Sequence, residues 1–427
     1  MVSLITGGFL MRRALKSLVV LFVFVIPAFV SAALHVGVGK KDLTPLLGTP
    51  SAWYSERKGE GMEGVHDPLL ALTLFIDNEE KKLALCSVDH LGFTYEMVQE
   101  IIERVHKEPG LEECEVYIAS SHTHSGGGAY LNIPVLGPIL AGPYNAETTQ
   151  FYVKQTADAI IEASRHVVPG KIGIGYGKAE DLSKYRGLWP RDVLPLSDVA
   201  VIKVITLDDA PLAALFNYAV HPTVLNAQNR EFSADFVGYA RDHLQTLLGS
   251  SMQPIYFNGA QGDIIPKIFN EEDRFESCEH LGQSLAETVE QIWNEIEVND
   301  CLTISTQKES YAFKPEATPF GLTFPIESYK TEMNIIVLNG VHAFITVPGE
   351  LSTLYDKHLK ETGREMGYKA VSIFGLTNDA HGYIILPESW KHKTFESGLS
   401  FGGENYGDVT KNRAEALLKN QRKNKEG

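Results

Sequence analysis

Two histidines that follow an apolar run carry the clearest chemical signal in this sequence. The run EVYIAS at 115–120 leads directly into Ser121-His122-Thr123-His124. Alternating apolar residues that end in Ser, His and Gly predict a buried strand opening into a loop. Histidines at i and i+2 on an extended backbone point the same way, and neutral imidazole is a common metal ligand. The pattern therefore predicts a metal-binding pair, and the alternative is two loop histidines bonded to the backbone.

Five further apolar runs end in the same manner. In α/β proteins, sites form beyond the carboxyl ends of strands, where loops converge. We therefore expect the six clusters to share one pocket. The five runs and the clusters that follow them are 82–88 with Asp89-His90, 213–220 with His221-Pro222-Thr223, 254–257 with Asn258 to Asp263, 342–347 with Pro348-Gly349-Glu350, and 369–376 with Thr377 to Tyr383.

The elements that must position these clusters follow from the same patterning. Helical spacing of apolar residues predicts helices over 96–107, 147–167 and 351–360, and a further strand is expected at 69–76. No repeat, low-complexity tract or Pro/Ser-rich linker interrupts the 427 residues. We predict an α/β fold with a mixed β-sheet core flanked by helices and a metal site at the strand-end loops. One domain is expected over 33–427.

The candidate ligands narrow the choice of metal. His122, His221 and Glu350 supply two imidazoles and a carboxylate without a thiolate, which is typical of catalytic zinc with an open position for water. Zinc lowers the pKa of a bound water to about 7, so hydroxide becomes available at neutral pH. Asp89 and Asp263 are candidate acceptors that orient a histidine ring. Their alternative interpretation is the capping of turns.

Residues 1–32 have the composition of an export signal. Arg12, Arg13 and Lys16 form a positive region, 17–30 is almost wholly apolar, and small residues precede a cut after Ala32. The apolar run is shorter than the ~20 residues that span a membrane, which favours a cleaved signal peptide over an N-terminal anchor. We therefore expect an exported protein, periplasmic or secreted.

Charge and cysteine content exclude some partners. The net charge is −16, and removal of 1–32, which carries three positive and no acidic residues, takes it to −19. Such a charge argues against binding to nucleic acid and against electrostatic attraction to anionic membranes. The four cysteines show no metal-binding spacing, and Cys86 in an apolar run is expected to be a buried thiol. One or two disulfides would suit an exported protein.

The sequence resembles the neutral/alkaline, non-lysosomal ceramidases, zinc amidohydrolases that cleave the N-acyl bond of ceramide. The resemblance runs through nearly the whole mature chain, in the family's order. The segments that carry it are Gly37-Val38-Gly39-Lys40-Lys41-Asp42-Leu43-Thr44-Pro45, Ser87-Val88-Asp89-His90-Leu91-Gly92, Ser121-His122-Thr123-His124-Ser125-Gly126, Ala219-Val220-His221-Pro222-Thr223, Ser233-Ala234-Asp235-Phe236-Val237-Gly238-Tyr239, Gly262-Asp263-Ile264-Ile265-Pro266 and Pro348-Gly349-Glu350-Leu351.

The resemblance implies roles for individual residues. It makes His122, His221, Glu350 and Tyr383 the zinc ligands, although the residues alone would leave Tyr383 as a loop aromatic. It places His124 beside the bound water or the reacting carbonyl. Arg186 matches a family arginine that faces the substrate pocket, and its alternative interpretation is a surface arginine. The catalytic residues implied are His124, Tyr383 and Arg186.

Two departures from the family affect the functional interpretation. The family's hexapeptide Gly-Asp-x-Ser-Pro-Asn reads Gly262-Asp263-Ile264-Ile265-Pro266-Lys267 here, so Ile265 stands where the family has its catalytic serine. Isoleucine can neither attack a carbonyl nor donate a hydrogen bond. Full-length members also carry a C-terminal β-sandwich domain, which has no counterpart after Tyr406-Gly407-Asp408. Ceramide itself is therefore not fixed as the substrate.

One loop next to the histidine pair bears on the substrate. The stretch 133–144 is apolar and rich in Pro and Gly. It suits a lid over an acyl chain or a patch that touches lipid. The alternative is a loop packed on the core. A small-molecule or lipid substrate and a transient contact with a membrane are the partners expected.

Together these features predict a zinc-dependent amidohydrolase, a C–N bond hydrolase of the ceramidase type. We expect it to cleave an acyl amide, such as an N-acyl lipid, with zinc-bound water as the nucleophile and with zinc and His124 or Tyr383 stabilising the oxyanion. Two alternatives stay open. One is a catalytically degenerate ceramidase-like binding protein, and the other is a zinc hydrolase of a non-lipid ester, lactone or amide.

Overall fold

Strands with alternating apolar side chains build a large mixed sheet in this computed structural model, which describes residues 34–187, 189–324 and 326–426. The predicted signal peptide, 1–32, lies outside the described residues. The outermost pairs β4/β5 and β9/β11 are parallel, and the remaining neighbours are antiparallel. The strands, in spatial order, are β11 (Gln253–Asn258), β9 (Pro211–Tyr218), β8 (Asp198–Thr206), β6 (Val168–Lys178), β1 (His35–Asp42), β3 (Leu70–Asp77), β4 (Lys82–Val88) and β5 (Glu115–Ser120).

A second, four-stranded sheet packs against the first. Its parallel pair is β15/β17, and its other neighbours are antiparallel. Its strands, in spatial order, are β13 (Ile304–Phe313), β14 (Tyr329–Leu338), β15 (His342–Thr346) and β17 (Ala370–Phe374). Three small two-stranded pairs complete the described strands: β2 (Gly64–Val65) with β10 (Glu231–Phe232), β7 (Ser183–Tyr185) with β12 (Ile264–Pro266), and β16 (Glu350–Leu351) with β18 (Tyr383–Ile384).

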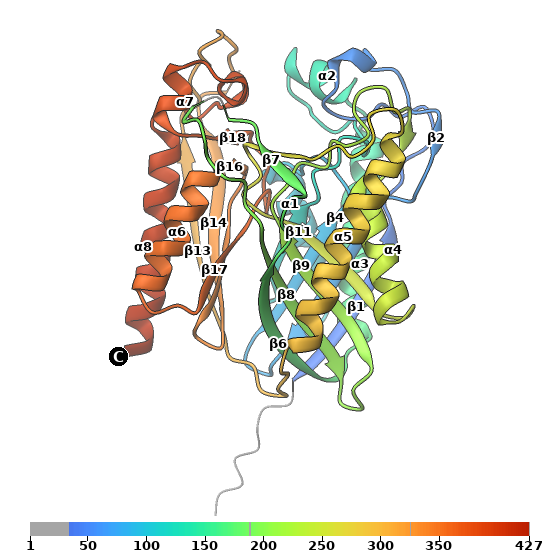
Figure 1. Cartoon of the computed structure of the whole chain (residues 1–427), viewed down its shortest axis with the longest axis vertical. Coiled ribbons are helices and arrows are strands. Elements are labelled where there is room, and N and C mark those ends of the chain that lie inside the picture. Colours follow the sequence, from blue (N-terminus) through green and yellow to red (C-terminus); the bar gives the residue numbers. More distant parts are fainter. Residues whose placement is uncertain (1–33, 188, 325, 427) are drawn as a thin grey trace, which may run out of the picture. The chain divides into compact units, whose positions relative to one another are not determined.

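Helices cover the outer faces of both sheets, as Figure 1 shows for α4 and α5 on one side and α6 and α8 on the other. The large sheet packs against α1 (Tyr95–His106), α3 (Ala146–Arg165), α4 (Phe236–Leu248) and α5 (Arg274–Glu295). The small sheet packs against α6 (Thr353–Glu365) and α8 (Tyr406–Glu426). Shorter helices are α2 (Leu136–Ala141), α7 (Pro387–Lys391), η1 (Ser55–Arg57) and η2 (Phe395–Leu399). Within the described ranges, no helix has both the length and the apolar character to cross a bilayer.

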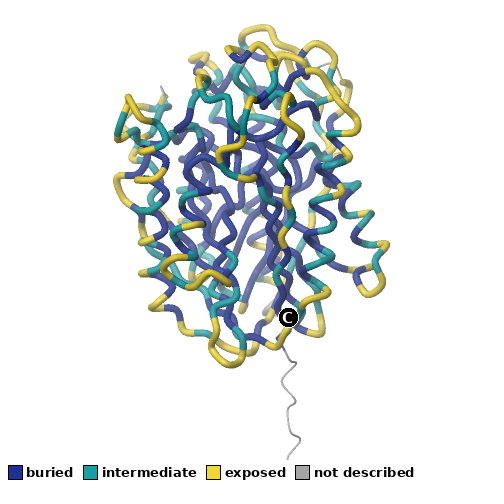
Figure 2. The backbone as a smooth tube through the Cα atoms, turned by 90° about the vertical axis from the view of Figure 1, so that its right-hand side faces the viewer, coloured by how far each residue is buried: buried dark blue, intermediate teal, exposed yellow. Residues whose placement is uncertain are grey.

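The period of two along each strand explains the layers. In β4, Leu83 and Leu85 face the small sheet, where Phe344 and Phe374 meet them in one cluster, while Ala84, Cys86 and Val88 face α1 and α3. Figure 2 shows the buried backbone concentrated in the interior. Helices, sheet, sheet and helices therefore form four layers, and the predicted mixed α/β fold is confirmed.

The observed elements largely match those predicted from periodicity. The strand at 82–88 is reproduced residue for residue, and α1 and α3 lie within two residues of their predicted bounds. Helix α6 starts at Thr353 rather than 351, because Leu351 pairs with Ile384 in the β16/β18 bridge. Cys86 is buried as predicted, and neither it nor the buried Cys114 and Cys278 is in a disulfide.

One buried histidine gives the fold a pH dependence that can be tested. His90 is fully buried among the rings of Phe93, Tyr130 and Tyr152. Burial lowers the pKa of its imidazole from 6.5 to about 3. The unfolded chain therefore binds a proton between these values that the folded chain does not. Stability from the neutral ring is complete above about pH 6.5 and is lost as the pH falls toward 3.

We predict that His90 lowers the free energy of unfolding by roughly 2 kcal/mol when the pH falls from 7.5 to 5. Denaturant unfolding of the wild type and of His90→Phe at both pH values measures this difference. The variant should show the shallower loss of unfolding free energy at pH 5, because its ring cannot take up a proton in the unfolded state. Equal losses in the two proteins would contradict the prediction.

Candidate metal centre

The strand-end loops are tied together by buried hydrogen bonds. Asn258 is the last residue of β11 and is fully buried. Its side-chain nitrogen donates to the carbonyl of Ser121 at 3.0 Å and to that of Val220 at 3.1 Å. The backbone N–H of Ser121 donates to the carbonyl of Val88 at 2.9 Å. These bonds fix the ends of β4, β5 and β9 against β11, a role that the sequence did not assign to Asn258.

Two histidines converge on one carboxylate oxygen. His122 Nε2 lies 3.2 Å from Glu350 Oε2, and His221 Nε2 lies 2.9 Å from the same oxygen. All three residues are buried, and the two imidazole rings are 5.0 Å apart. The structure therefore brings together three side chains that are distant in sequence: the first, His122, and the last, Glu350, are 228 residues apart.

The protonation of these rings follows from their second nitrogens. His122 Nδ1 lies 2.6 Å from the carbonyl of Leu91, and His221 Nδ1 lies 2.9 Å from the carbonyl of Ile264. A carbonyl only accepts, so each Nδ1 carries the proton and each neutral ring presents a lone pair at Nε2. Two lone pairs then face a carboxylate oxygen, which also only accepts. A cation between the three atoms resolves this repulsion.

The electrostatics of the centre favour a neutral His221 ring and a charged carboxylate. Burial, aided by the Arg186 guanidinium, lowers the pKa of His221 to about 4. Burial alone would raise the pKa of the Glu350 carboxyl, whereas His122 and His221 lower it well below its ordinary range when a proton is present at Nε2. At neutral pH the centre therefore holds a negative charge with imidazole donors, which fits a divalent cation of the zinc type.

His124 lies beside this centre, and no described residue forms a hydrogen bond with its ring. Its ring nitrogens are both buried and unpaired, and His122, His124 and His221 each offer a nitrogen within 4.8 Å of the others. Burial, followed by the proximity of His122 and His221, lowers the pKa of His124 well below 6.5. A neutral, unpaired imidazole at this position can accept or donate one proton.

The backbone that carries the two neighbouring histidines differs from the prediction. Strand β5 ends at Ser120, as predicted, but the backbone that we expected to stay extended through the histidines has a left-handed φ of 72° at His122. The His122 and His124 rings are still 5.0 Å apart. Arg57, which the sequence did not reveal, holds the loop by donating to the carbonyl of His124 at 2.6 Å. Tyr54 packs against the His124 ring at 5.1 Å.

Tyr383 and Arg186 form the other side of the centre. Residue pairing between β16 and β18 sets Tyr383 opposite Glu350. Arg186 Nη2 donates to the Tyr383 hydroxyl at 3.0 Å and lies 3.5 Å from His221 Nε2. Burial and the Glu350 charge raise the pKa of the Tyr383 phenol, and Arg186 opposes this rise. Arg186 is thus a site residue and not a surface arginine.

Asp89 and Asp263 do not orient a histidine ring, and in this respect the sequence prediction was wrong. Asp89 accepts two bonds from Arg241, at 3.1 and 2.7 Å, in a buried ion pair. Asp263 accepts the backbone N–H of Thr353 at 2.8 Å and so caps α6 directly after Glu350. The acceptors that orient the rings are main-chain carbonyls, which leave no side-chain signal in the sequence.

Ile265 occupies the middle of β12 and is half-buried. Its neighbour Ile264 carries the carbonyl that orients His221 and is itself fully buried. Ile265 is not among the residues that line the cavity next to His122 and Glu350. The position of the family serine therefore supplies no hydroxyl at the centre.

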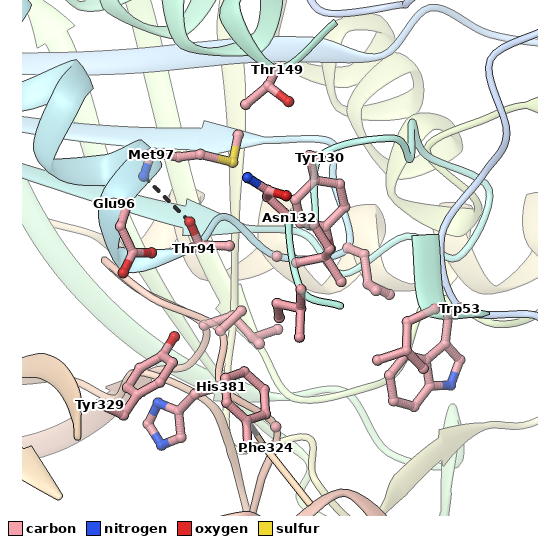
Figure 3. A pocket seen from close by; sticks show the side chains of 18 of the residues that line it. Trp53, Thr94, Glu96, Met97, Tyr130, Asn132, Thr149, Phe324, Tyr329 and His381 are labelled. Atoms are coloured by element: carbon pink, nitrogen blue, oxygen red, sulfur yellow. Dashed lines mark hydrogen bonds between the residues drawn. The ribbon is translucent and has the colours of Figure 1, made fainter. Parts of the chain in front are cut away.

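A cavity of about 470 Å³ opens from the centre on the side of His122 and Glu350. Figure 3 shows Met97, Tyr130 and Asn132 on one side of it and Phe324, Tyr329 and His381 across from them. Its walls are mainly apolar, with Glu96 and Glu100 of α1 among the polar lining. Such a cavity suits an extended apolar group with a few polar atoms.

The apolar segment 133–144 forms one wall of this cavity. Ile133, Leu140 and Tyr144 line it, while Leu136 is buried in the core. Val135 is 76% exposed and Ile139 is 56% exposed, so the segment also offers apolar side chains to its surroundings. Both interpretations made from the sequence, a cover over the site and a loop packed on the core, describe part of what is seen.

Known proteins resemble this chain in sequence. A family model described as neutral/alkaline non-lysosomal ceramidase, N-terminal, matches residues 34–278. Neutral ceramidase of Drosophila melanogaster is 24% identical over 328 residues, which cover 62% of this chain and 45% of that protein. Neutral ceramidase of Pseudomonas aeruginosa is 24% identical over 226 residues, or 48% of this chain and 33% of that protein. The chain thus spans less than half the length of these relatives.

Solved structures show the same fold. The crystal structure of neutral ceramidase from Pseudomonas aeruginosa superimposes with a TM-score of 0.83 at 16% identity, covering 92% of this chain and 75% of that chain. A ceramidase complexed with C2 gives a TM-score of 0.82 at 14% identity, covering 92% and 76%.

The repulsion at Glu350 leads to a prediction about stability without metal. In chelator at pH 8, Glu350→Gln should raise the unfolding free energy by about 1 kcal/mol, because the amide donates a hydrogen bond to a histidine lone pair. Zinc at 100 times its Kd should stabilise the wild type by about 2.7 kcal/mol and the variant far less. Denaturant unfolding with and without zinc measures both effects.

Glu332→Gln is the matched control, because Glu332 is equally buried but pairs with Lys308 instead of histidine. That substitution should destabilise the protein in chelator and leave the zinc response intact. A destabilised metal-free Glu350→Gln would show that no repulsion exists at the centre.

Proposed function

Because this chain belongs to the neutral/alkaline non-lysosomal ceramidase family, we propose that it is a zinc-dependent hydrolase of an acyl amide, acting on ceramide or a related N-acyl lipid. The observation that carries the proposal is the convergence of His122 Nε2 and His221 Nε2 on Glu350 Oε2. A divalent cation would satisfy all three atoms, and this donor set is one that catalytic zinc prefers.

The residues that would hold the metal are His122, His221 and Glu350, with Tyr383 as the fourth ligand that the family resemblance implies. Their support is burial, the fixed tautomers and the pairing of β16 with β18. When bound, zinc supplies a Lewis acid for an acyl carbonyl and a water of lowered pKa.

His124 is the residue placed to move the proton. Hydrolysis forms a bond between a water oxygen and the acyl carbon and breaks the bond from that carbon to nitrogen. The proton that the water loses must reach the leaving amine. His124 is neutral and has no partner at either ring nitrogen, so it can accept this proton and return it to the amine.

Arg186 and Tyr383 are proposed to act on charge that develops at the acyl oxygen. The Tyr383 hydroxyl and Arg186 Nη2 lie 3.0 Å apart at the edge of the centre. Donors fixed before the reaction stabilise an oxyanion without reorganisation, which is a large source of catalysis. The two residues are held by different elements, β18 and the loop after β7.

The cavity favours a lipid-like substrate. Met97, Leu131, Leu140 and Phe401 give it apolar walls next to the centre. Exposed Val135 and Ile139 support a transient contact with a membrane surface. The net charge of −16 opposes binding to nucleic acid. We further propose that 1–32 direct export to the periplasm or the exterior, and that 33–427 act as one domain.

Ile265 favours a second candidate, a degenerate binding protein that retained the metal centre. The family serine is proposed to act in catalysis, and this chain has no hydroxyl at that position. The two candidates differ in turnover and not in metal content. A panel of N-acyl amides, acyl esters and lactones, incubated with the zinc-loaded protein, separates them.

We predict that the wild type hydrolyses at least one acyl compound of the panel, depends on zinc, and shows no burst of covalent acyl-enzyme. His221→Ala should lower the rate by at least about a hundredfold, whereas His342→Ala, at a buried histidine remote from the cavity, should not. Release of free fatty acid measures the rate.

Ile265→Ser decides between the candidates when the wild type is inactive. A gain of ceramide hydrolysis in the variant alone would replace the active-enzyme proposal by the degenerate one. If neither protein hydrolyses any member of the panel, the proposed substrate class is wrong.

A further inference from the structure

Arg186, which contacts the candidate metal centre, also forms a buried ion pair with Glu396. Arg186 Nε donates to Glu396 Oε1 at 2.9 Å. Glu396 is only 4% exposed and belongs to η2, far in sequence from the loop that carries Arg186. A buried carboxylate is stable when it is paired, and the guanidinium is the one cation in contact with it among the described residues.

The other edge of the guanidinium faces the centre. Arg186 Nη2 donates to the Tyr383 hydroxyl and to the carbonyl of Gly262, each at 3.0 Å, and lies 3.5 Å from His221 Nε2. Because the guanidinium is planar and rigid, fixing Nε also fixes the direction of both Nη atoms. Glu396 therefore determines where the Nη2 donor points.

The ring next to Glu396 reinforces this orientation. The guanidinium carbon of Arg186 lies 5.2 Å from the centre of the Phe395 ring, which lies 6.4 Å from the Tyr383 ring. Phe395 is 59% exposed, so it covers the arginine from outside and is not a core residue. A carboxylate and an aromatic face thus hold one guanidinium from two directions.

The segment that supplies Glu396 also builds part of the substrate cavity. Leu399 and Phe401 line the cavity. Ser400 bridges to Gly382, next to Tyr383. One short stretch therefore connects the cavity wall to the arginine at the centre, and its distance from Arg186 in sequence explains why no local pattern revealed it.

We propose that Glu396 is the positioning residue that fixes the Arg186 guanidinium toward the reacting centre. The inference rests on the proposed function, because it assigns Glu396 an effect on turnover that acts only through Arg186. Without the carboxylate, the arginine side chain regains its rotamer freedom and its Nη2 donor loses its direction.

A double-mutant cycle tests this dependence. Glu396→Leu should lower kcat by roughly tenfold to a hundredfold, as expected for a misplaced catalytic group, and should leave KM within about twofold because the cavity walls are unchanged. Glu396→Gln keeps an acceptor for Nε and should retain most of the rate. In an Arg186→Met background, Glu396→Leu should change kcat by less than about twofold.

Glu404→Leu is the matched control, since Glu404 pairs with Lys391 in a solvent-accessible bridge after the same segment. It should leave kcat unchanged. A loss in Glu396→Leu that is equally large in both backgrounds would assign Glu396 to the fold alone and overturn the proposal. Full activity in Glu396→Leu would overturn it as well.

A second readout needs no turnover and so separates this inference from the proposed function. In protein labelled with ¹⁵N-arginine, the Nε–H resonance that disappears in Arg186→Met should be protected from exchange in the wild type and in Glu396→Gln. It should lose protection in Glu396→Leu. Retained protection in Glu396→Leu overturns the positioning role, even when no variant hydrolyses any substrate.

Discussion

The structure depends on one electrostatic constraint, the meeting of two imidazole lone pairs and a carboxylate oxygen within 3.2 Å in a buried space. Each tautomer is fixed from behind by a main-chain carbonyl, so neither ring can turn its N–H toward Glu350. Such a centre is unfavourable as it stands and favourable around a divalent cation.

The layered architecture holds the three side chains in this arrangement. Glu350 begins β16, which follows β15 of the small sheet, whereas His122 and His221 lie just after β5 and β9 of the large sheet, so segments that leave both sheets carry the three side chains. Asn258 and Asp263 lock the loops between them, by bonds to Ser121 and Val220 and by the cap on α6. Hydrogen bonds between these two side chains and the main chain therefore hold the loops that carry the centre.

Much of this could be predicted from the sequence because it is local. Apolar periodicity located β4, α1 and α3 to within two residues, and the polar clusters after six runs identified the strand ends that meet. The left-handed turn at His122 was missed, because φ depends on the loop's contacts with β4. Arg57, Glu396 and the ring-orienting carbonyls were missed because their partners lie far away in sequence or carry no side-chain signature.

Anomalous diffraction at the zinc edge, on crystals of the zinc-loaded protein, shows whether these three side chains bind the metal. We predict one anomalous peak about 2.0–2.2 Å from His122 Nε2, His221 Nε2 and Glu350 Oε2, with both Nδ1 atoms still bonded to their carbonyls. A peak at a different cluster, or a fully loaded crystal with these three atoms uncoordinated, would contradict it.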